Sequence, residues 1–340
     1  QQTSTVEFSI PPRLSDTLIL PVLTDDKKGK NDRMNVSVIV SVHNAEDILP
    51  VTLPALLNQD YSEGTIEFIV VDDSSSDATP AVLENREWND RCKIIRHTEN
   101  RGRCATRNSG IKAANGDLII FIDCDIEVES TFVSRHVEKH KDFKITGVLS
   151  NLRPYTDELK NKYHRYLFHG NRGAQLVGSH KPLPFRYFIM TCSSVKTEAV
   201  KRTGLFNENL PGYGIDLHYA YRLWKNFSDG LYFDPDITVR MHKLKSISRA
   251  LDDFTDYGRR NVPIILKEFP ELAPYIGADF VKAPGQHVSF RNVIGSIFIN
   301  QAMMALARGF YLLLPFPLSN AFIRYLMAAS IVTGYRATID

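Results

Sequence analysis

The sequence predicts an α/β protein built around a doubly wound, mostly parallel β-sheet. Short apolar runs rich in β-branched residues alternate with longer segments of helical periodicity over residues 36–123. Each apolar run also ends in polar residues, and in an open α/β sheet ligands bind outside the carboxyl ends of the strands. The 340 residues are enough to bury a substantial core. We therefore expect a sheet with a polar, ligand-binding edge.

The predicted elements follow one another in a regular order. Each strand is a run of valine, isoleucine and similar residues, and each helix repeats apolar residues on one face. They are strand 36–42, helix 45–58, strand 66–71, a helix from Thr79, strand 93–96, helix 104–114, strand 118–122, helix 128–143, strand 145–150, strand 187–195 and strand 231–242. Alternation of this kind places neighbouring strands parallel, with helices as the crossovers.

Two carboxylates, Asp123 and Asp125, follow the strand at residues 118–122. The five apolar residues of this strand predict that it is fully buried. Because alternate residues of a strand point to the same side, both carboxylates can face one crevice. Close carboxylates repel each other unless a cation is present, and hard oxygen ligands suit Mg²⁺ or Mn²⁺ bound to a phosphate. The alternative is a solvated strand end with two surface acids, because the motif is short.

Composition and missing motifs exclude several classes of protein. The net charge of +2 gives no reason to expect a nucleic-acid partner. Four cysteines without C-x-x-C spacing favour a reducing compartment over a zinc site or a disulfide framework. No secretory signal is visible at the first residues, although Gln1 need not be the native start. Neither G-x-G-x-x-G after the first strand nor G-x-x-x-x-G-K-[ST] is present, which disfavours a dehydrogenase and a P-loop enzyme.

Four consecutive motifs resemble those of family 2 glycosyltransferases, and the resemblance covers about residues 35–244. The motifs are V-S-V-I-V-S-V-H-N, V-V-D-D-S-S-S-D-A-T, N-R-G-R-C-A-T-R-N-S-G and I-F-I-D-C-D. The resemblance implies a GT-A fold and an inverting, metal-dependent enzyme that uses Mn²⁺ or Mg²⁺. It also implies a nucleotide-sugar donor, with a UDP-sugar favoured, and a hydroxyl acceptor.

The resemblance also assigns the donor site. The expected nucleotide-binding positions are Val42, His43, Asp73, Gly102, Arg103 and Asp123. His43 occupies the place of an aromatic ring that stacks on the base, where the family more often has tyrosine, and Asp73 matches the acid that binds uracil. Gly102 lets backbone approach the ligand and Arg103 offers bidentate phosphate contacts. The alternative for both Arg103 and Arg107 is a solvated helix face, and a functional role is favoured more for Arg103 than for Arg107.

By the same resemblance, the metal ligands are Asp123, Asp125 and His242, which ends a predicted strand. Asp216 matches the catalytic base, which takes the proton of the acceptor hydroxyl. An aspartate there could also be a helix N-cap. The family's usual glutamate before the base is replaced by Ile215, and this is a departure.

His136 and His140 lie four residues apart on a predicted helix, a spacing that can hold a metal ion. No third ligand is evident from the sequence. We therefore interpret them as surface histidines.

The last part of the chain changes character. We divide the chain into an N-terminal arm (1–34), a catalytic domain (35–248) and a helical C-terminal region (249–340). From Phe280 to Ile339 there is no acidic residue, whereas five arginine and lysine residues and long apolar runs remain. This pattern favours helices lying on an anionic membrane surface. A membrane span and core or dimer packing are the alternatives, so a homo-oligomer stays open.

The sequence thus predicts a cytoplasmic, peripheral or monotopic enzyme that acts on a lipid-linked or membrane-proximal glycan in polysaccharide or glycolipid synthesis. The absence of Q-x-x-R-W favours a non-processive enzyme. Two rivals remain. One is a nucleotidyltransferase, which would normally show a glycine-rich basic loop after the first strand. The other is a catalytically inactive relative that serves as a membrane scaffold, for which Ile215 is the support.

Overall fold

The computed structural model describes residues 33–156, 159, 161–169, 172–282, 285 and 287–339. Residues 33–340 form one compact unit. The predicted N-terminal arm lies almost entirely outside the described residues. The boundary expected at residue 248 stays a prediction.

The described residues form one mixed sheet of eight strands in the order β3-β2-β1-β4-β7-β6-β8-β5. The strands are β1 (Val36–Val42), β2 (Ile66–Asp72), β3 (Cys92–Arg96), β4 (Leu118–Asp123), β5 (Ile126–Val128), β6 (Gly147–Pro154), β7 (Cys192–Lys196) and β8 (Leu231–Met241). The four strands from β3 to β4 are parallel, as predicted. β7 runs antiparallel to both β4 and β6, and β6 is parallel to β8.

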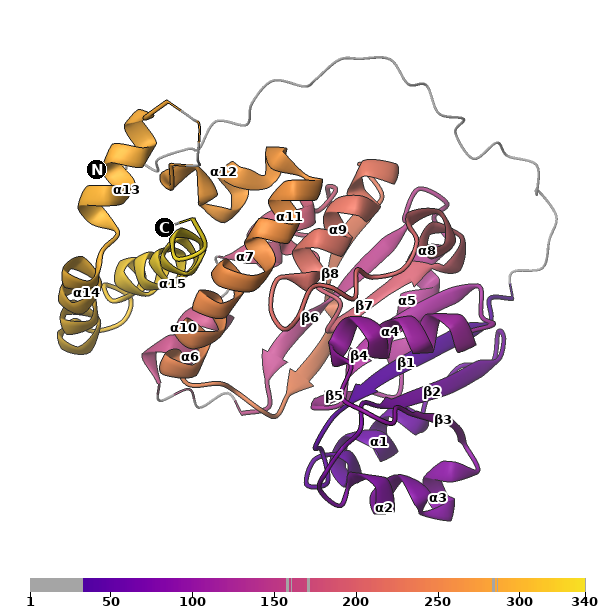
Figure 1. Ribbon diagram of the computed structural model, residues 1–340. Helices are drawn as coiled ribbons and strands as arrows, with labels where there is room; N and C mark the ends of the chain where they lie inside the picture. The colour runs from indigo at the N-terminus through magenta and orange to yellow at the C-terminus, as the bar shows by residue number, and fades with distance from the viewer. Residues whose placement is uncertain are drawn as a thin grey trace. The chain divides into compact units, whose positions relative to one another are not determined.

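The helices connect and cover these strands (Figure 1). They are α1 (Leu49–Leu57), α2 (Thr79–Glu84), α3 (Arg86–Asn89), α4 (Gly102–Ala113), α5 (Phe132–His140), α6 (Lys162–Phe168), α7 (Gly173–Val177), α8 (Thr197–Thr203), α9 (Ile215–Asn226), α10 (Ile247–Asp256), α11 (Val262–Glu268), α12 (Ala273–Ile276), α13 (Phe290–Phe298), α14 (Gln301–Leu313) and α15 (Asn320–Arg336). Short turns complete the set at η1 (Phe185–Tyr187), η2 (Tyr257–Asn261, a π-helical turn), η3 (Pro270–Leu272) and η4 (Ala278–Phe280).

The core lies along the middle of the sheet. Val38, Ile69 and Ile120, from three neighbouring strands, are completely buried. Burial on both faces explains why these strands read as continuous apolar runs rather than as alternating ones. The turn at 124–125 and β5 come before α5, so the helix predicted from residue 128 in fact begins at Phe132.

The interpretation of His136 and His140 as surface histidines is wrong. They are 0% and 2% exposed. A nitrogen of each ring lies 2.8 Å from the Ser194 hydroxyl oxygen, and His136 also bonds the Ser150 hydroxyl. Burial lowers the pKa of His136 to about 3. Both are uncharged core residues whose ring nitrogens are satisfied by hydroxyls of β6 and β7 and, for His140 Nδ1, by the Ile145 carbonyl oxygen.

The helices α13, α14 and α15 gather at the end of the molecule away from β1–β3 (Figure 1). α15 packs closely on the turn after α10. A side chain at Gly258 would put Cβ 2.0 Å from the carbonyl oxygen of Ile331, and one at Gly334 would meet that of Thr255 at the same distance. Glycine therefore lets the two backbones touch, and α15 is joined to the rest of the unit.

In contrast to α15, α13 and α14 leave many of their apolar side chains exposed. Many are largely exposed, namely Phe290, Val293, Ile297, Phe298, Leu306, Phe310, Leu312 and Leu313. Within the described part of the chain, no single helix has the length and hydropathy to cross a membrane. α13 and α14 together meet that criterion as a pair bent by 63°.

Candidate active site

Asp73 organises the edge of the sheet where β1 and β2 end. Its Oδ1 accepts hydrogen bonds from His97 Nδ1 at 2.7 Å and from the Arg101 backbone N–H at 2.9 Å. Its Oδ2 accepts one from the Gly102 backbone N–H at 2.8 Å. Since a carboxylate oxygen has two acceptor positions, Oδ2 keeps one of them, although the Asp73 side chain is only 6% exposed. The side chain expected to bind the base therefore also fixes the loop beside it.

Val42 and His43 lie at the same edge in different environments. The Val42 side chain is 2% exposed, and its carbonyl oxygen accepts from the backbone N–H of Asp73 at 2.9 Å. His43 is exposed, with Nδ1 3.0 Å from the Asp73 carbonyl oxygen. Val42 can thus contribute backbone only, whereas the His43 ring faces solvent and can stack on a planar ligand.

Gly102 begins α4 with a φ of +82°, a backbone conformation that favours glycine. A Cβ at this position would meet nothing within 4 Å, so the backbone faces open space. Arg103 follows on the exposed surface of the helix. Its positive charge acts on Asp125 and Tyr213. The first turn of α4 therefore offers an exposed cation, which forms no ion pair with any described residue, next to an accessible backbone.

Asp123 and Asp125 are close enough to interact, but not through strand alternation. β4 ends at Asp123, and Asp125 lies in the turn before β5. Burial, and next the charge of Asp123, raise the pKa of Asp125 to about 6. Burial raises the pKa of Cys124 between them to about 12, so that thiol stays protonated. The pair is a concentration of negative charge that a cation would relieve.

His242 lies just after β8, where its backbone N–H donates to the Asp125 carbonyl oxygen at 3.0 Å. Its Nε2 is 2.6 Å from Glu127 Oε2, and its ring stacks on Tyr155 with centroids 4.0 Å apart. Among the described residues, no three histidine, cysteine or acidic side chains are arranged as a ready metal site. The two aspartates suit a hard cation. His242 could join them through Nδ1 while its Nε2 stays on Glu127, as metal-ligating histidines commonly do.

Arg107 joins the two halves of the site. Its Nη1 donates to Asp216 Oδ1 at 2.7 Å, and its Nη2 lies 3.4 Å from Asp123 Oδ1. The side chain is 2% exposed, whereas those of Asp216 and Asp123 are 25% and 18% exposed. Its guanidinium also lies over the Phe206 ring, 5.5 Å from the centroid. One buried cation therefore holds two partly open carboxylates on the same edge.

The interpretation of Arg107 as part of a solvated helix face is wrong. The residue types around Arg107 were the one sequence signal that it could be buried. From Cys104 to Asn108 every residue of α4 is buried, and this run is small or polar rather than aliphatic. A helix segment that is polar and buried on all sides needs partners for its polar groups. Asn108 has them too, since its Nδ2 donates to the Phe206 carbonyl oxygen and to Glu208 Oε1.

Asp216 is the second residue of α9 and not its N-cap, which is Gly214. Gly214 has a φ of +80°, and a Cβ there would lie 1.9 Å from the Tyr257 ring. Ile215 is 3% exposed and belongs to the main core. The residue that replaces the family's glutamate is therefore part of the hydrophobic core. The carboxylate of Asp216 beside it is retained and is 25% exposed.

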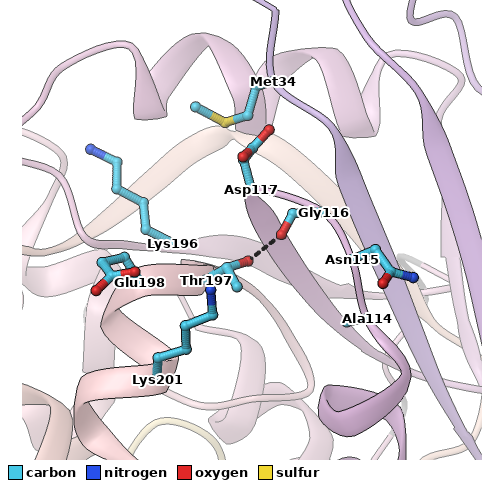
Figure 2. Close-up of a pocket in the computed structure, with 9 residues that line it drawn as sticks. All are labelled: Met34, Ala114, Asn115, Gly116, Asp117, Lys196, Thr197, Glu198 and Lys201. Atoms are coloured by element: carbon cyan, nitrogen blue, oxygen red, sulfur yellow. Dashed lines mark hydrogen bonds between the residues drawn. The ribbon is translucent and has the colours of Figure 1, made fainter. Parts of the chain in front are cut away.

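A cavity of about 540 Å³ opens at the opposite edge of the sheet, where β4 begins and β7 ends. Figure 2 shows Lys196, Glu198 and Lys201 on one side and Asp117 on another, with the Thr197 hydroxyl donating to the Gly116 carbonyl oxygen. None of the predicted site residues lines it. We therefore place the candidate site at the Asp123–Asp216 edge.

Comparison with known proteins identifies the family of this chain. Residues 37–204 match the family model described as "Glycosyl transferase family 2". The chain is similar to the putative glycosyltransferase EpsH of Bacillus subtilis, with 34% identity over 151 residues, which cover 40% of this chain and 43% of EpsH. It is also similar to WfaP of Escherichia coli, described as a UDP-Glc:alpha-D-GlcNAc-diphosphoundecaprenol beta-1,3-glucosyltransferase. That match is 31% identical over 206 residues, 56% of this chain and 69% of WfaP. The chain thus spans less than half of EpsH.

Among solved structures, the fold is similar to that of the mannosyltransferase PcManGT from Pyrobaculum calidifontis in complex with GDP-Man and Mn²⁺. The TM-score is 0.54 at 19% sequence identity, and the match covers 88% of this chain and 87% of the other. At this identity the likeness concerns the fold, which is that of GT-A transferases.

Proposed function

The chain belongs to glycosyltransferase family 2, and from that premise we propose that it transfers a sugar from a UDP-sugar to a hydroxyl group of a lipid-linked or membrane-proximal glycan. One observation carries the proposal. Arg107 holds Asp216 and Asp123 at 2.7 and 3.4 Å, which puts a candidate base and a candidate donor-binding carboxylate on one edge. The WfaP relative, which by its name acts on a diphosphoundecaprenol acceptor, supports the substrate class.

In the proposed reaction Asp216 accepts the proton of the acceptor hydroxyl. The oxygen attacks the anomeric carbon while the bond from that carbon to the diphosphate oxygen breaks, and UDP leaves. A single displacement inverts the configuration. Arg107 holds the carboxylate of Asp216 in place from its buried side, which leaves the 25% exposed side for the acceptor. The enzyme releases its product after one transfer.

The donor is bound by the residues of the first four strands. Asp73 Oδ2 accepts from the uracil N–H, the His43 ring stacks on the base, and Arg103 meets the phosphates. Asp123, Asp125 and His242 would hold Mn²⁺ or Mg²⁺, which neutralises the charge of the leaving diphosphate. The pKa of Asp125, raised first by burial and next by the charge of Asp123, supports this, since a bound cation favours the ionised carboxylate.

The protein works at the cytoplasmic face of a membrane, where α13 and α14 lie in the interface. Their exposed apolar side chains and the absence of acidic residues between Phe280 and Ile339 support this. Each basic residue near an anionic surface adds about 1 kcal/mol.

The test is turnover of UDP-sugars, each offered with and without Mn²⁺ or Mg²⁺. We expect metal-dependent release of UDP for one sugar in the panel, and loss of that release in Asp216→Asn. Asp90→Asn, a surface aspartate of the same chemistry, is the matched control. No release from any sugar of the panel would contradict the proposal.

A further inference from the structure

A second cavity, of about 270 Å³, opens on the other half of the sheet between β6, α6, α7 and η1. Its floor is formed by β6, and its walls are largely apolar. Leu149, Asn151, Leu167, Arg172, Gln175 and Arg186 are among the residues that line it. Nothing in the proposed donor site uses this cavity.

Two arginines line the cavity without a countercharge. Arg172 is half-buried, stacks 4.0 Å from the Tyr166 ring centroid and donates to the Tyr166 carbonyl oxygen at 3.2 Å. Arg186 is exposed at the rim, beside the Tyr187 ring. In the described part of the chain neither guanidinium pairs with a carboxylate. Burial, opposed by nearby tyrosines and assisted by the charge of Arg324, lowers the pKa of Arg172.

One polar atom that lines the cavity also lacks a hydrogen-bond partner among the described residues. Gln175 Nε2 donates to Asn151 Oδ1 at 3.0 Å, whereas Gln175 Oε1 is buried and has no hydrogen-bond partner. A partly desolvated cation without an anion is costly, and an anionic ligand removes that cost. A guanidinium presents a planar fork of donors that matches a phosphate group. Gln175 Oε1 can accept from a hydroxyl of the same ligand.

The cavity lies on a different half of the sheet from the proposed base-binding residue. Its lining comes from β6 and η1, whereas Asp73 follows β2 near the other end of the strand order. The charges of Asp216 and Asp123 act on the Tyr213 hydroxyl, and that of Arg172 acts on Tyr163. A ligand group at Arg172 would therefore lie on the half of the sheet away from Asp73.

The same helix that borders the cavity also contacts the exposed apolar end of α14. Lys162 of α6 donates through Nζ to the carbonyl oxygens of Tyr311, Leu312 and Leu314. Leu312 and Leu313 are 70% and 81% exposed. A charged cavity and an exposed apolar surface thus lie on the two sides of one short helix.

We propose that the Arg172–Arg186 cavity binds the phosphate group of an acceptor in which that phosphate is esterified to an apolar chain. The guanidinium groups bind the phosphate, and the apolar chain follows the walls toward α14. This inference rests on the proposed function, because it concerns the acceptor of the same reaction. It adds a site for an acceptor phosphate, separate from the diphosphate of the donor.

The probe is dodecyl phosphate, titrated into the full chain by calorimetry below its critical micelle concentration. EDTA is present so that no divalent cation supports binding at Asp125. We expect the Arg172→Gln/Arg186→Gln double variant to bind at least about tenfold more weakly, the scale of lost charge-assisted hydrogen bonds. Arg202→Gln, an exposed arginine on α8, is the charge-matched control and should bind as the unaltered protein does.

Two further ligands identify what is recognised. Dodecanol tests the apolar chain alone, and inorganic phosphate tests the anion alone. Both should bind more weakly than dodecyl phosphate. Equal affinity of the double variant for dodecyl phosphate, or no binding by the unaltered protein, overturns the site. Equal affinity for inorganic phosphate overturns the assignment to a lipid ester.

The proposed function is measured separately as release of UDP by the unaltered protein. If UDP is released but dodecyl phosphate binding ignores both arginines, only the inference fails. If dodecyl phosphate binding depends on the arginines but no UDP-sugar is turned over, the proposed function fails.

Discussion

The donor-side edge of the sheet and the α13–α14 pair differ in whether their side chains have partners within the chain. At the edge, Asp73 accepts three hydrogen bonds and Arg107 is bound by two carboxylates, all from within the chain. On α14, Leu312 and Leu313 remain 70% and 81% exposed. The edge is organised before any ligand arrives, whereas the helices leave an apolar surface for something outside the chain to cover.

This difference has a physical basis in what each group requires. A buried polar group without a partner costs about 1–3 kcal/mol, so the edge must satisfy its own groups for the fold to form. An exposed leucine costs nothing comparable to a buried unpaired charge. Covering it gains about 1.5–3 kcal/mol, a gain still available to a membrane or a partner. Substitutions at the edge should therefore affect chemistry, and substitutions on α14 should affect association.

The largest effect is expected for Asp125→Ala, which should abolish metal-dependent binding of UDP. The substitution removes the carboxylate whose pKa is raised beside Asp123, and with it the strongest candidate for a cation ligand. Calorimetry with UDP and Mn²⁺ measures this, and binding to anionic liposomes in the same preparation should be unchanged. Undiminished affinity for UDP in the presence of Mn²⁺ would remove Asp125 from the metal site.

Asp216→Asn should retain UDP binding and lower turnover by about two or more orders of magnitude, the scale of general-base loss. Asparagine can still bond Arg107 through its amide oxygen, so the local fold should persist. Thermal unfolding and UDP affinity report on that point, with Asp90→Asn as control. A kcat near that of the unaltered protein would mean that another group takes the proton.

In the α13–α14 pair, Leu312→Ser/Leu313→Ser should weaken binding to anionic liposomes by about a hundredfold or more, since two buried leucine side chains together contribute about 3–6 kcal/mol. UDP binding should not change. Flotation with vesicles of defined anionic lipid content gives the partition coefficient, and sedimentation without lipid reports whether a second copy covers the face instead. Equal flotation of variant and unaltered protein would place the membrane contact elsewhere.

Metal-dependent UDP binding should weaken about tenfold for each pH unit below about 6, as Asp125 takes up a proton. The stability of the folded protein should change with pH in the opposite direction. Because the folded-state pKa exceeds the unfolded value, the stabilisation from Asp125 is present at low pH and is lost as pH rises through 6. Asp125→Asn should remove both dependences. Titrations between pH 4.5 and 7.5 with Mn²⁺ and UDP test the first, and denaturant midpoints test the second.

The smallest effect is expected for Gly102→Ala, because a Cβ there meets open space but φ is +82°. An alanine in this conformation costs about 1–2 kcal/mol, so stability should fall slightly and UDP affinity a few fold. Gly309→Ala, on α14 and also facing open space, is the matched control. It lacks a positive φ and should not lose stability.

Much of the fold could be predicted from local sequence. Continuous apolar runs identified β1, β2 and β4, because strands buried on both faces have no polar positions within them. The order of strand and helix indicated the parallel half of the sheet. Polar residues directly after each run located the edge and named Asp123 and Asp125 as its members, whereas Asp73 was singled out by the family resemblance. Apart from Asp73, these conclusions need only chain periodicity and the rule that strand ends share an edge.

Only the tertiary structure decided the partners of the buried polar residues. Arg107 and Asp216 lie 109 positions apart in the chain, and their 2.7 Å contact exists because α4 and α9 meet beside β4. A histidine pair in a helix is usually solvated, so sequence reasoning put His136 on the surface, and it left a solvated helix face open for Arg107. Likewise, apolar composition could not tell which leucines of α14 would stay uncovered. Burial depends on which elements pack together, and that is a property of the whole chain rather than of any segment.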